Sequence, residues 1–88
     1  MIESALEKSI GRWCKQQGYQ WLKLAGPRGW PDRTLIIPGR VVFVETKTPT
    51  GRLSPHQQFW LAKLSELGQE CFVVRSLEEL QKCLCQKF

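Results

Sequence analysis

A chain of 88 residues forms one domain, and a domain this short buries only roughly 60–65% of the surface that its unfolded chain exposes, so its core is thin. Hydrophobic residues make up 42% and charged residues 24%, which is ordinary for a globular domain and argues against disorder. The net charge of +5 is unevenly placed, because residues 8–52 carry nine basic and two acidic side chains, whereas the rest of the chain has more acids than bases. A basic excess confined to one half is typical of a polyanion-binding face.

The N-terminal segment predicts a helix followed by a short strand. Over residues 2–17, apolar side chains recur at helical spacing, and Gly18 follows as a stop. Residues 19–24 (YQWLKL) partly alternate between apolar and polar side chains, which predicts a first strand. The next segment, AGPRGWP, contains two glycines and two prolines and is therefore expected to be a loop.

Two strands joined by a tight turn are expected after this loop. Residues 33–37 and 41–47 favour strands, and Pro38-Gly39-Arg40 between them favours a turn. The second of these strands, VVFVETK, begins with apolar side chains only. This composition is expected of a strand that is central in its sheet and buried on both faces.

The remaining residues predict a helix, a strand and a last helix. Ser54 is expected to cap a helix that runs to Leu67, with Pro55 at its first position and Gln57 completing a capping box. Residues 71–75 (CFVVR) predict a fourth strand, and the last helix starts after Ser76. The order α-β-β-β-α-β-α predicts an α/β fold, a small mixed sheet flanked by helices. The first three strands form a meander, and the helix between strands three and four makes those two parallel.

Two acids and a lysine should converge at one end of this sheet. Glu45 and Lys47 lie two residues apart on one strand and point to the same face, with Thr46 on the opposite face. Asp32 lies six residues before the proline-glycine turn and Glu45 six residues after it, so the hairpin brings the two carboxylates together.

Two adjacent carboxylates repel each other unless a cation lies between them, and Mg²⁺ binds carboxylate oxygens while keeping several waters. Such a metal can polarise a phosphodiester and lower the pKa of a bound water. Lys47 could orient or deprotonate that water, or offset charge that develops at phosphorus. In the alternative interpretation, Glu45 and Lys47 are an exposed strand pair and Asp32 is only a turn residue.

Other polar side chains have two possible roles each. Gln57 either serves only the capping box or also donates to a ligand carboxylate, to Lys47 or to the water. Glu3 and Glu7 lie one turn apart on the first helix, and either could turn toward the metal instead of remaining solvated. His56, the single histidine, is expected at the surface and not as a general base.

The cysteines and the first residues indicate the compartment. The spacing Cys83-x-Cys85 is not that of a zinc knuckle or a redox pair, so all four cysteines are expected to be free thiols, with a structural zinc site as the alternative. The first residues, MIESALEK, contain acids where a secretory signal has an apolar segment, and no apolar run approaches the roughly 20 residues of a membrane span. We therefore expect a cytoplasmic protein without a membrane partner.

The segments GWPDR, VVFVETK, GRLSPHQQFW and LGQECFVVRS together resemble the virus-type replication-repair nuclease (VRR-NUC) family of the PD-(D/E)xK nuclease superfamily. The resemblance covers residues 3–79. D…ExK alone is a permissive motif, but the Gly-x-Pro-Asp before it and the Leu-Ser-x-x-Gln helix start followed by Trp60 make the match specific. The family occurs as an appended domain in a Fanconi-anaemia-associated nuclease and as stand-alone chains in bacteriophages and bacteria. This chain resembles the stand-alone form, which makes residues 1–88 one VRR-NUC domain, in the host cytoplasm if a phage encodes it.

The resemblance implies a restriction-endonuclease-like core with a Mg²⁺ or Mn²⁺ site. Asp32 and Glu45 match the metal-binding acids of the family, and the main-chain carbonyl of Thr46 matches a further ligand. Glu3 best matches the acid on the first helix of the family, with Glu7 as the fallback.

The resemblance also implies the catalytic groups and the substrate. Lys47 matches the catalytic lysine and Gln57 the glutamine on the following helix. The strongly basic loop of some relatives is short here, with Arg28 alone before GWPD. The candidate DNA contacts are Lys15, Lys23, Arg28, Arg33 and Arg52.

The expected function is a metal-dependent endonuclease that cuts branched DNA, most of all a four-way (Holliday) junction, as a homodimer. The candidate apolar side chains for the dimer interface are Trp21, Trp30, Phe59, Leu61 and Phe88. Two alternatives remain: a DNA-binding or assembly module of the same fold that does not cut, and a monomeric nuclease acting on flaps or overhangs.

Overall fold

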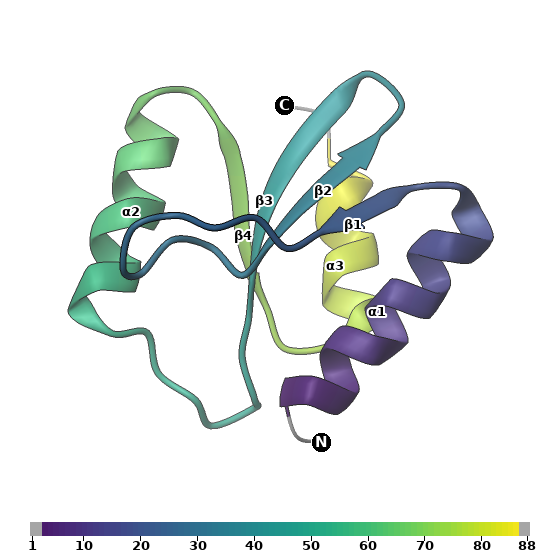
Figure 1. Ribbon diagram of the computed structural model, residues 1–88, viewed down its shortest axis with the longest axis horizontal. Coiled ribbons are helices and arrows are strands. Elements are labelled where there is room, and N and C mark those ends of the chain that lie inside the picture. Colours follow the sequence, from purple (N-terminus) through teal and green to yellow (C-terminus); the bar gives the residue numbers. More distant parts are fainter. Residues whose placement is uncertain (1–2, 87–88) are drawn as a thin grey trace.

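A computed structural model describes residues 3–86 of the protein and confirms the predicted order of elements (Figure 1). In chain order they are α1 (Glu3–Gln17), β1 (Gln20–Leu22), β2 (Arg33–Ile37), β3 (Arg40–Thr46), α2 (Pro55–Glu66), β4 (Glu70–Val74) and α3 (Leu77–Leu84). The expected first helix began at Ile2, which lies outside the described residues. β1 is shorter than expected, because the chain leaves its partner strand after Leu22 and enters the loop.

The four strands form one mixed sheet in the order β1-β2-β3-β4, as the connections predict. β1 pairs with β2 and β2 with β3 in antiparallel fashion, whereas β3 and β4 are parallel across the α2 connection. The β2–β3 register pairs Ile37 with Arg40 next to the turn and Arg33 with Val44 at the far end. This far end of the hairpin is where the predicted acids lie.

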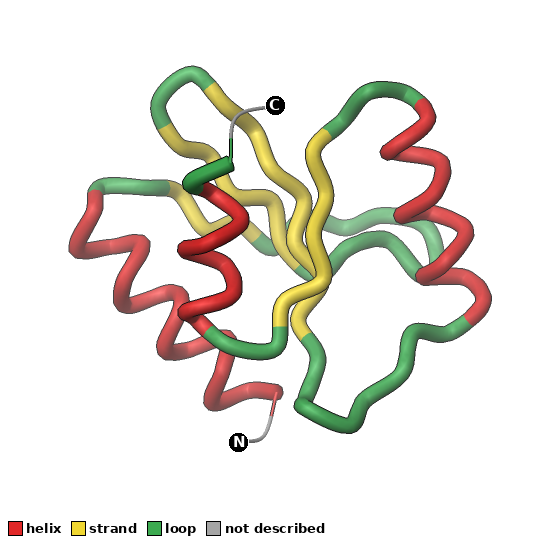
Figure 2. Tube along the Cα trace, turned by 180° about the vertical axis from the view of Figure 1, so that it is seen from behind, coloured by secondary structure: helices red, strands yellow, loops and turns green. Residues whose placement is uncertain are grey.

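Helices cover the two faces of the sheet unequally. α1 and α3 pack together on one face, and α2 lies on the other (Figures 1 and 2). The fully buried core lies under α1 and α3 and consists of Leu6, Ile10, Cys14, Leu35, Val42, Val44, Val74 and Leu80. α2 contributes one buried side chain, Leu64, so the layer under this helix is thin.

The expectation that β3 is buried on both faces is wrong at its first residues. Strand alternation places Val42 in the core and Val41 on the opposite face, where its side chain is 48% exposed. Its partner across the hairpin, Ile36, is 39% exposed on the same face. α2 therefore leaves the turn end of the hairpin uncovered.

All four cysteines are free thiols, as expected. Cys14 belongs to the core, and burial raises the pKa of its thiol to about 11, which keeps it protonated and unreactive. Within residues 3–86, no helix combines the length and the apolar character needed to cross a membrane.

Candidate active site

The β2–β3 hairpin brings Asp32 and Glu45 to the same end of the sheet. Since Arg33 pairs with Val44, the next residue out on each strand places Asp32 beside Glu45. The backbone amide of Thr46 donates to Oδ2 of Asp32 at 3.0 Å, which ties the residue before β2 to the last residue of β3. The count of six residues on each side of the turn therefore gives the correct pairing.

The loop before Asp32 is held against α2 by a glycine and a tryptophan. Gly29 has a φ of +87°, and a β-carbon on it would lie 2.4 Å from the carbonyl carbon of His56, so no other residue fits there without a shift. The Trp30 ring packs edge-to-face on Trp60 of α2 and Phe43 of β3, with centroids 5.3 and 5.7 Å away. These contacts explain the Gly-Trp-Pro-Asp sequence in structural terms, because they fix the position of the loop directly before Asp32. His56 itself is exposed, as expected.

A cluster of three carboxylates forms where the hairpin meets the start of α1. One carboxylate oxygen each from Glu3, Asp32 and Glu45 lies within 4.8 Å of the other two. Glu7 lies outside this cluster, because Arg33 binds both of its carboxylate oxygens, each at 3.2 Å. Of the two candidate acids on the first helix, the structure thus places Glu3 in the cluster and Glu7 in an ion pair.

Glu45 lies in an environment that disfavours its charge unless a cation is present. Its side chain is 1% exposed; Oε2 accepts from Gln57 and lies 4.0 Å from Nζ of Lys47. Oε1 is buried without a hydrogen-bond partner among residues 3–86. Burial, then the neighbouring Asp32 carboxylate, raise the pKa of Glu45 to about 8, although Lys47 acts in the opposite direction. An unpaired buried carboxylate oxygen within a group of acids fits a divalent cation with oxygen ligands.

Gln57 fills both of the roles considered for it. Its Oε1 accepts from the backbone amide of Ser54 at 2.8 Å, and its backbone amide donates to Oγ of Ser54, which completes the capping box of α2. Its Nε2 donates to Oε2 of Glu45 at 3.1 Å. The first turn of α2 is therefore attached directly to the carboxylate cluster.

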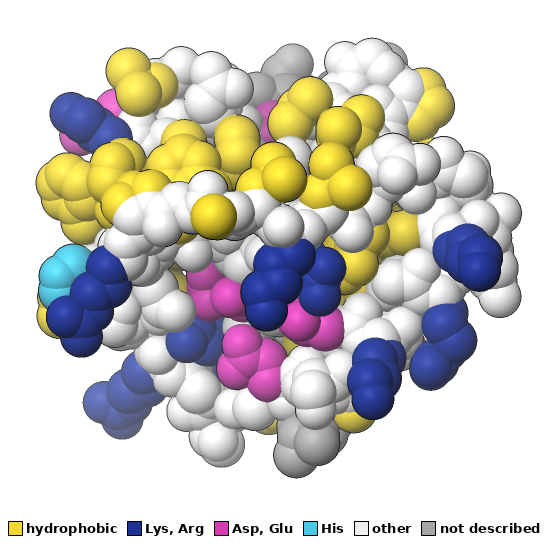
Figure 3. Space-filling model, viewed as in Figure 1, with side chains coloured by type: hydrophobic (Ala, Val, Ile, Leu, Met, Phe, Trp, Pro, Cys, Tyr) yellow, Lys and Arg dark blue, Asp and Glu magenta, His cyan; other side chains and the backbone are white. Residues whose placement is uncertain are grey.

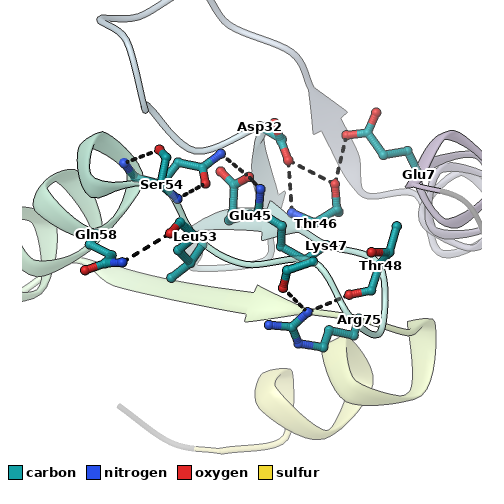
Figure 4. Close-up of polar contacts among 12 residues, drawn as sticks. Glu7, Asp32, Glu45, Thr46, Lys47, Thr48, Leu53, Ser54, Gln58 and Arg75 are labelled. Carbon is teal, nitrogen blue, oxygen red and sulfur yellow. Dashed lines mark hydrogen bonds and ion pairs between the residues drawn. The ribbon is translucent and has the colours of Figure 1, made fainter.

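Arg75 supports the segment after Lys47, a role that the sequence does not predict. Its Nη1 donates to the carbonyl oxygens of Thr48 and Gly51, at 2.5 and 2.7 Å (Figure 4). The backbone amide of Lys47 also donates to the carbonyl oxygen of Val74. The end of β4 thus holds the loop that joins Lys47 to α2. Residues 71–75 are expected to form a strand, but β4 ends at Val74, and no local pattern indicates the partners of Arg75.

The basic candidates differ in their availability to a polyanion. Lys15, Lys23, Arg28 and Arg52 are exposed. Arg33 is engaged with Glu7, and its guanidinium lies 5.6 Å from the centre of the Trp21 ring. Figure 3 shows lysine and arginine side chains around the acidic side chains on this face of the molecule.

The chain is similar to proteins of one family. A family model described as VRR-NUC domain matches residues 1–78. The protein named "Putative nuclease p44" of Acyrthosiphon pisum secondary endosymbiont phage 1 is 34% identical over 77 residues, which cover 84% of this chain and 83% of that protein. A solved structure described as "VRR_NUC domain" has a TM-score of 0.83 and 27% sequence identity, over 98% of this chain and 97% of the other.

Proposed function

The chain belongs to the VRR-NUC domain family, a nuclease family, and we propose that it is a metal-dependent endonuclease that cuts branched DNA. The observation that carries this proposal is the carboxylate cluster, in which Oε2 of the buried Glu45 lies 4.0 Å from Nζ of Lys47 and its other oxygen, Oε1, has no hydrogen-bond partner among residues 3–86. A protein that only binds DNA gains nothing from desolvated acids on its basic face, because they repel phosphates.

Each group of the site has a separate task in this proposal. A divalent cation, when bound, supplies Lewis acidity toward the phosphodiester and lowers the pKa of water. Asp32, Glu45 and the main-chain carbonyl of Thr46 would hold it, with Glu3 as a further carboxylate. Because all these ligand atoms are oxygens, Mg²⁺ or Mn²⁺ is the suitable ion.

Lys47 acts on the reacting atoms in this proposal. Its ammonium lies 4.0 Å from Oε2 of Glu45 and is largely buried, so it can reach a water or a phosphate oxygen bound at the cluster. There it would position the attacking water in line with phosphorus and offset the negative charge of the transition state. The hydrogen bond from Gln57 would hold Oε2 of Glu45 in place for the cation and for Lys47.

A homodimer that acts on four-way junctions is the proposed working form. Apolar side chains form a band over α2, the loop before β2 and the β2–β3 hairpin, beside the acidic cluster (Figure 3). Among residues 3–86, the exposed large hydrophobic residues are Leu24, Ile36, Val41, Phe59 and Leu67. A second copy related by a two-fold axis would cover such a face and present two sites to a substrate of nearly the same symmetry.

The expected interface residues differ in how available they are. Phe59 is 57% exposed and is the strongest of them. Trp30 is already packed between α2 and β3, and Trp21 lies under Arg33. Phe88 lies outside the described residues.

Cleavage of a set of DNA structures tests the proposed function. The protein is incubated with a synthetic four-way junction, a flap, a single-stranded overhang and a linear duplex, in Mg²⁺, Mn²⁺ or EDTA. We expect paired cuts in the junction that disappear in EDTA. Cleavage in EDTA would contradict the metal requirement, and a preference for flaps would favour the monomeric alternative. Binding of every structure without any cut would favour the non-cleaving module.

A further inference from the structure

We propose that the hydroxyl group of Thr46 positions Asp32 for metal binding, and that the Glu7–Arg33 ion pair keeps this hydroxyl directed at Asp32. The inference rests on the proposed function, in which Asp32 is a metal ligand. It assigns a task to the Thr46 side chain that is separate from that of its main-chain carbonyl.

Two donors from one residue hold a single oxygen of Asp32. The backbone amide and the hydroxyl of Thr46 both donate to Oδ2, each at 3.0 Å. A carboxylate oxygen has about two lone-pair sites, so Oδ2 is fully used and Oδ1 is the oxygen left for a cation. Because both donors belong to a rigid strand end, they also fix the rotation of the carboxylate plane.

Thr46 reaches Asp32 from the face of the sheet that α1 covers. Its side chain is 0% exposed at the end of β3 and lies on the side of α1, whereas Glu45 faces α2 (Figure 4). A side chain without a hydroxyl at this position would leave the backbone hydrogen bond intact. It would remove the second donor and allow the carboxylate to rotate.

The ion pair between Glu7 of α1 and Arg33 of β2 determines which carboxylate accepts the hydroxyl proton of Thr46. Oγ1 of Thr46 is 3.0 Å from Asp32 Oδ2 and 3.4 Å from Oε1 of Glu7, so two carboxylates compete for one donor. Arg33 donates to both oxygens of Glu7, which satisfies that carboxylate and offsets its charge. The hydroxyl proton is therefore available to Asp32.

Two pairs of variants isolate the hydroxyl. Wild type and Thr46→Val differ by the hydroxyl in nearly constant volume, and Thr46→Ser and Thr46→Ala differ only by one oxygen. Mn²⁺ binding is measured directly without DNA, by the electron paramagnetic resonance signal of free Mn²⁺, on proteins whose fold circular dichroism confirms. Thr34→Val is the control, because it removes a hydroxyl group in the same way at a buried position of β2 outside the carboxylate cluster.

We expect the hydroxyl-free member of each pair to bind Mn²⁺ about tenfold more weakly, as is usual when a group that orients a metal ligand is lost. Thr34→Val should bind like wild type. In cleavage, the Mg²⁺ concentration for half-maximal rate should rise, while the rate at saturating Mg²⁺ changes less. If Thr46→Val does not fold, the serine–alanine pair decides the question.

Equal Mn²⁺ affinity within both pairs would overturn the inference and leave the proposed function standing, provided that wild type binds Mn²⁺ and cuts DNA. A wild-type protein that binds no Mn²⁺ would overturn the proposed metal site and this inference together.

Discussion

Gln57 donates a hydrogen bond from Nε2 to Oε2 of Glu45 at 3.1 Å, and the cap of α2 fixes the direction of this bond. Because the backbone amide of Ser54 occupies Oε1 of Gln57, the amino group of the same amide must point to the carboxylate cluster. One side chain therefore joins the start of a helix to the candidate metal site.

Gln57→Glu should separate these two tasks. Glutamate still accepts from Ser54 in a capping box, so the cap of α2 and its contribution of about 1 kcal/mol to stability should be retained. It cannot donate to Glu45 and adds a like charge, so the cleavage rate should fall about tenfold or more. Ser54→Ala should show the reverse, a loss of about 1 kcal/mol of stability with a smaller loss of rate. Urea unfolding and single-turnover cleavage check both; a Gln57→Glu protein that cuts at the wild-type rate would contradict the task assigned to the amide.

Lys47→Ala should reduce the cleavage rate by roughly 10²-fold or more, the range typical of groups that act on a proton or on transition-state charge. DNA affinity, measured in EDTA, should fall by no more than about one phosphate contact. Lys63→Ala is the control, because Lys63 lies on α2 in an exposed pair with Glu66. If affinity falls in full proportion to rate, Lys47 serves only to hold DNA.

The metal-free protein should lose stability as the pH rises from 4.5 to about 8. In this window folded Glu45, with its pKa raised to about 8, retains a proton that the unfolded chain has lost. The folded state then binds more protons, so the free energy of unfolding falls with pH. Glu70, whose pKa Arg40 lowers, acts at lower pH and does not contribute there.

Glu45→Gln isolates this effect, because glutamine has similar size and does not titrate. Urea unfolding in EDTA at several pH values between 5 and 9 should give a shallower slope for Glu45→Gln than for wild type. Equal slopes would show that Glu45 does not titrate in this window.

The parts of the site that depend on local patterns could be predicted from the sequence. Strand alternation and the number of residues on each side of the turn are sufficient to pair Asp32 with Glu45. The capping box likewise identifies the start of α2 and places Gln57 in its first turn.

The parts that depend on packing between elements could not be predicted. The choice between Glu3 and Glu7 depends on the angle at which α1 crosses the sheet, and the Arg33 partner of Glu7 is 26 residues away. Arg75 follows β4 and contacts the loop after Lys47, at the end of the neighbouring strand β3, and no local pattern indicates this contact. The exposure of Val41 depends on how far α2 extends over the sheet.

The working unit should be a dimer, with a mass in sedimentation at micromolar concentration near twice 10.2 kDa. Phe59→Ser should weaken the dimer, because it removes an exposed aromatic ring from α2. Mixed dimers of wild type and Asp32→Ala should nick four-way junctions on one strand only, since one site is inactive. A monomeric mass with full junction cleavage would contradict the dimer and favour a flap or overhang nuclease.

Cleavage by Asp32→Ala and Glu45→Ala, with Mg²⁺ titrated through the millimolar range, tests the central claim most directly. Each change removes a ligand at the end of the sheet and no residue of the hydrophobic core cluster, so both variants should fold. Both should bind DNA at least as tightly as wild type, because neither change removes a positive charge that could contact phosphates. The metal-site account predicts that neither variant cuts DNA at any Mg²⁺ concentration; a rate near that of wild type for either one would contradict it.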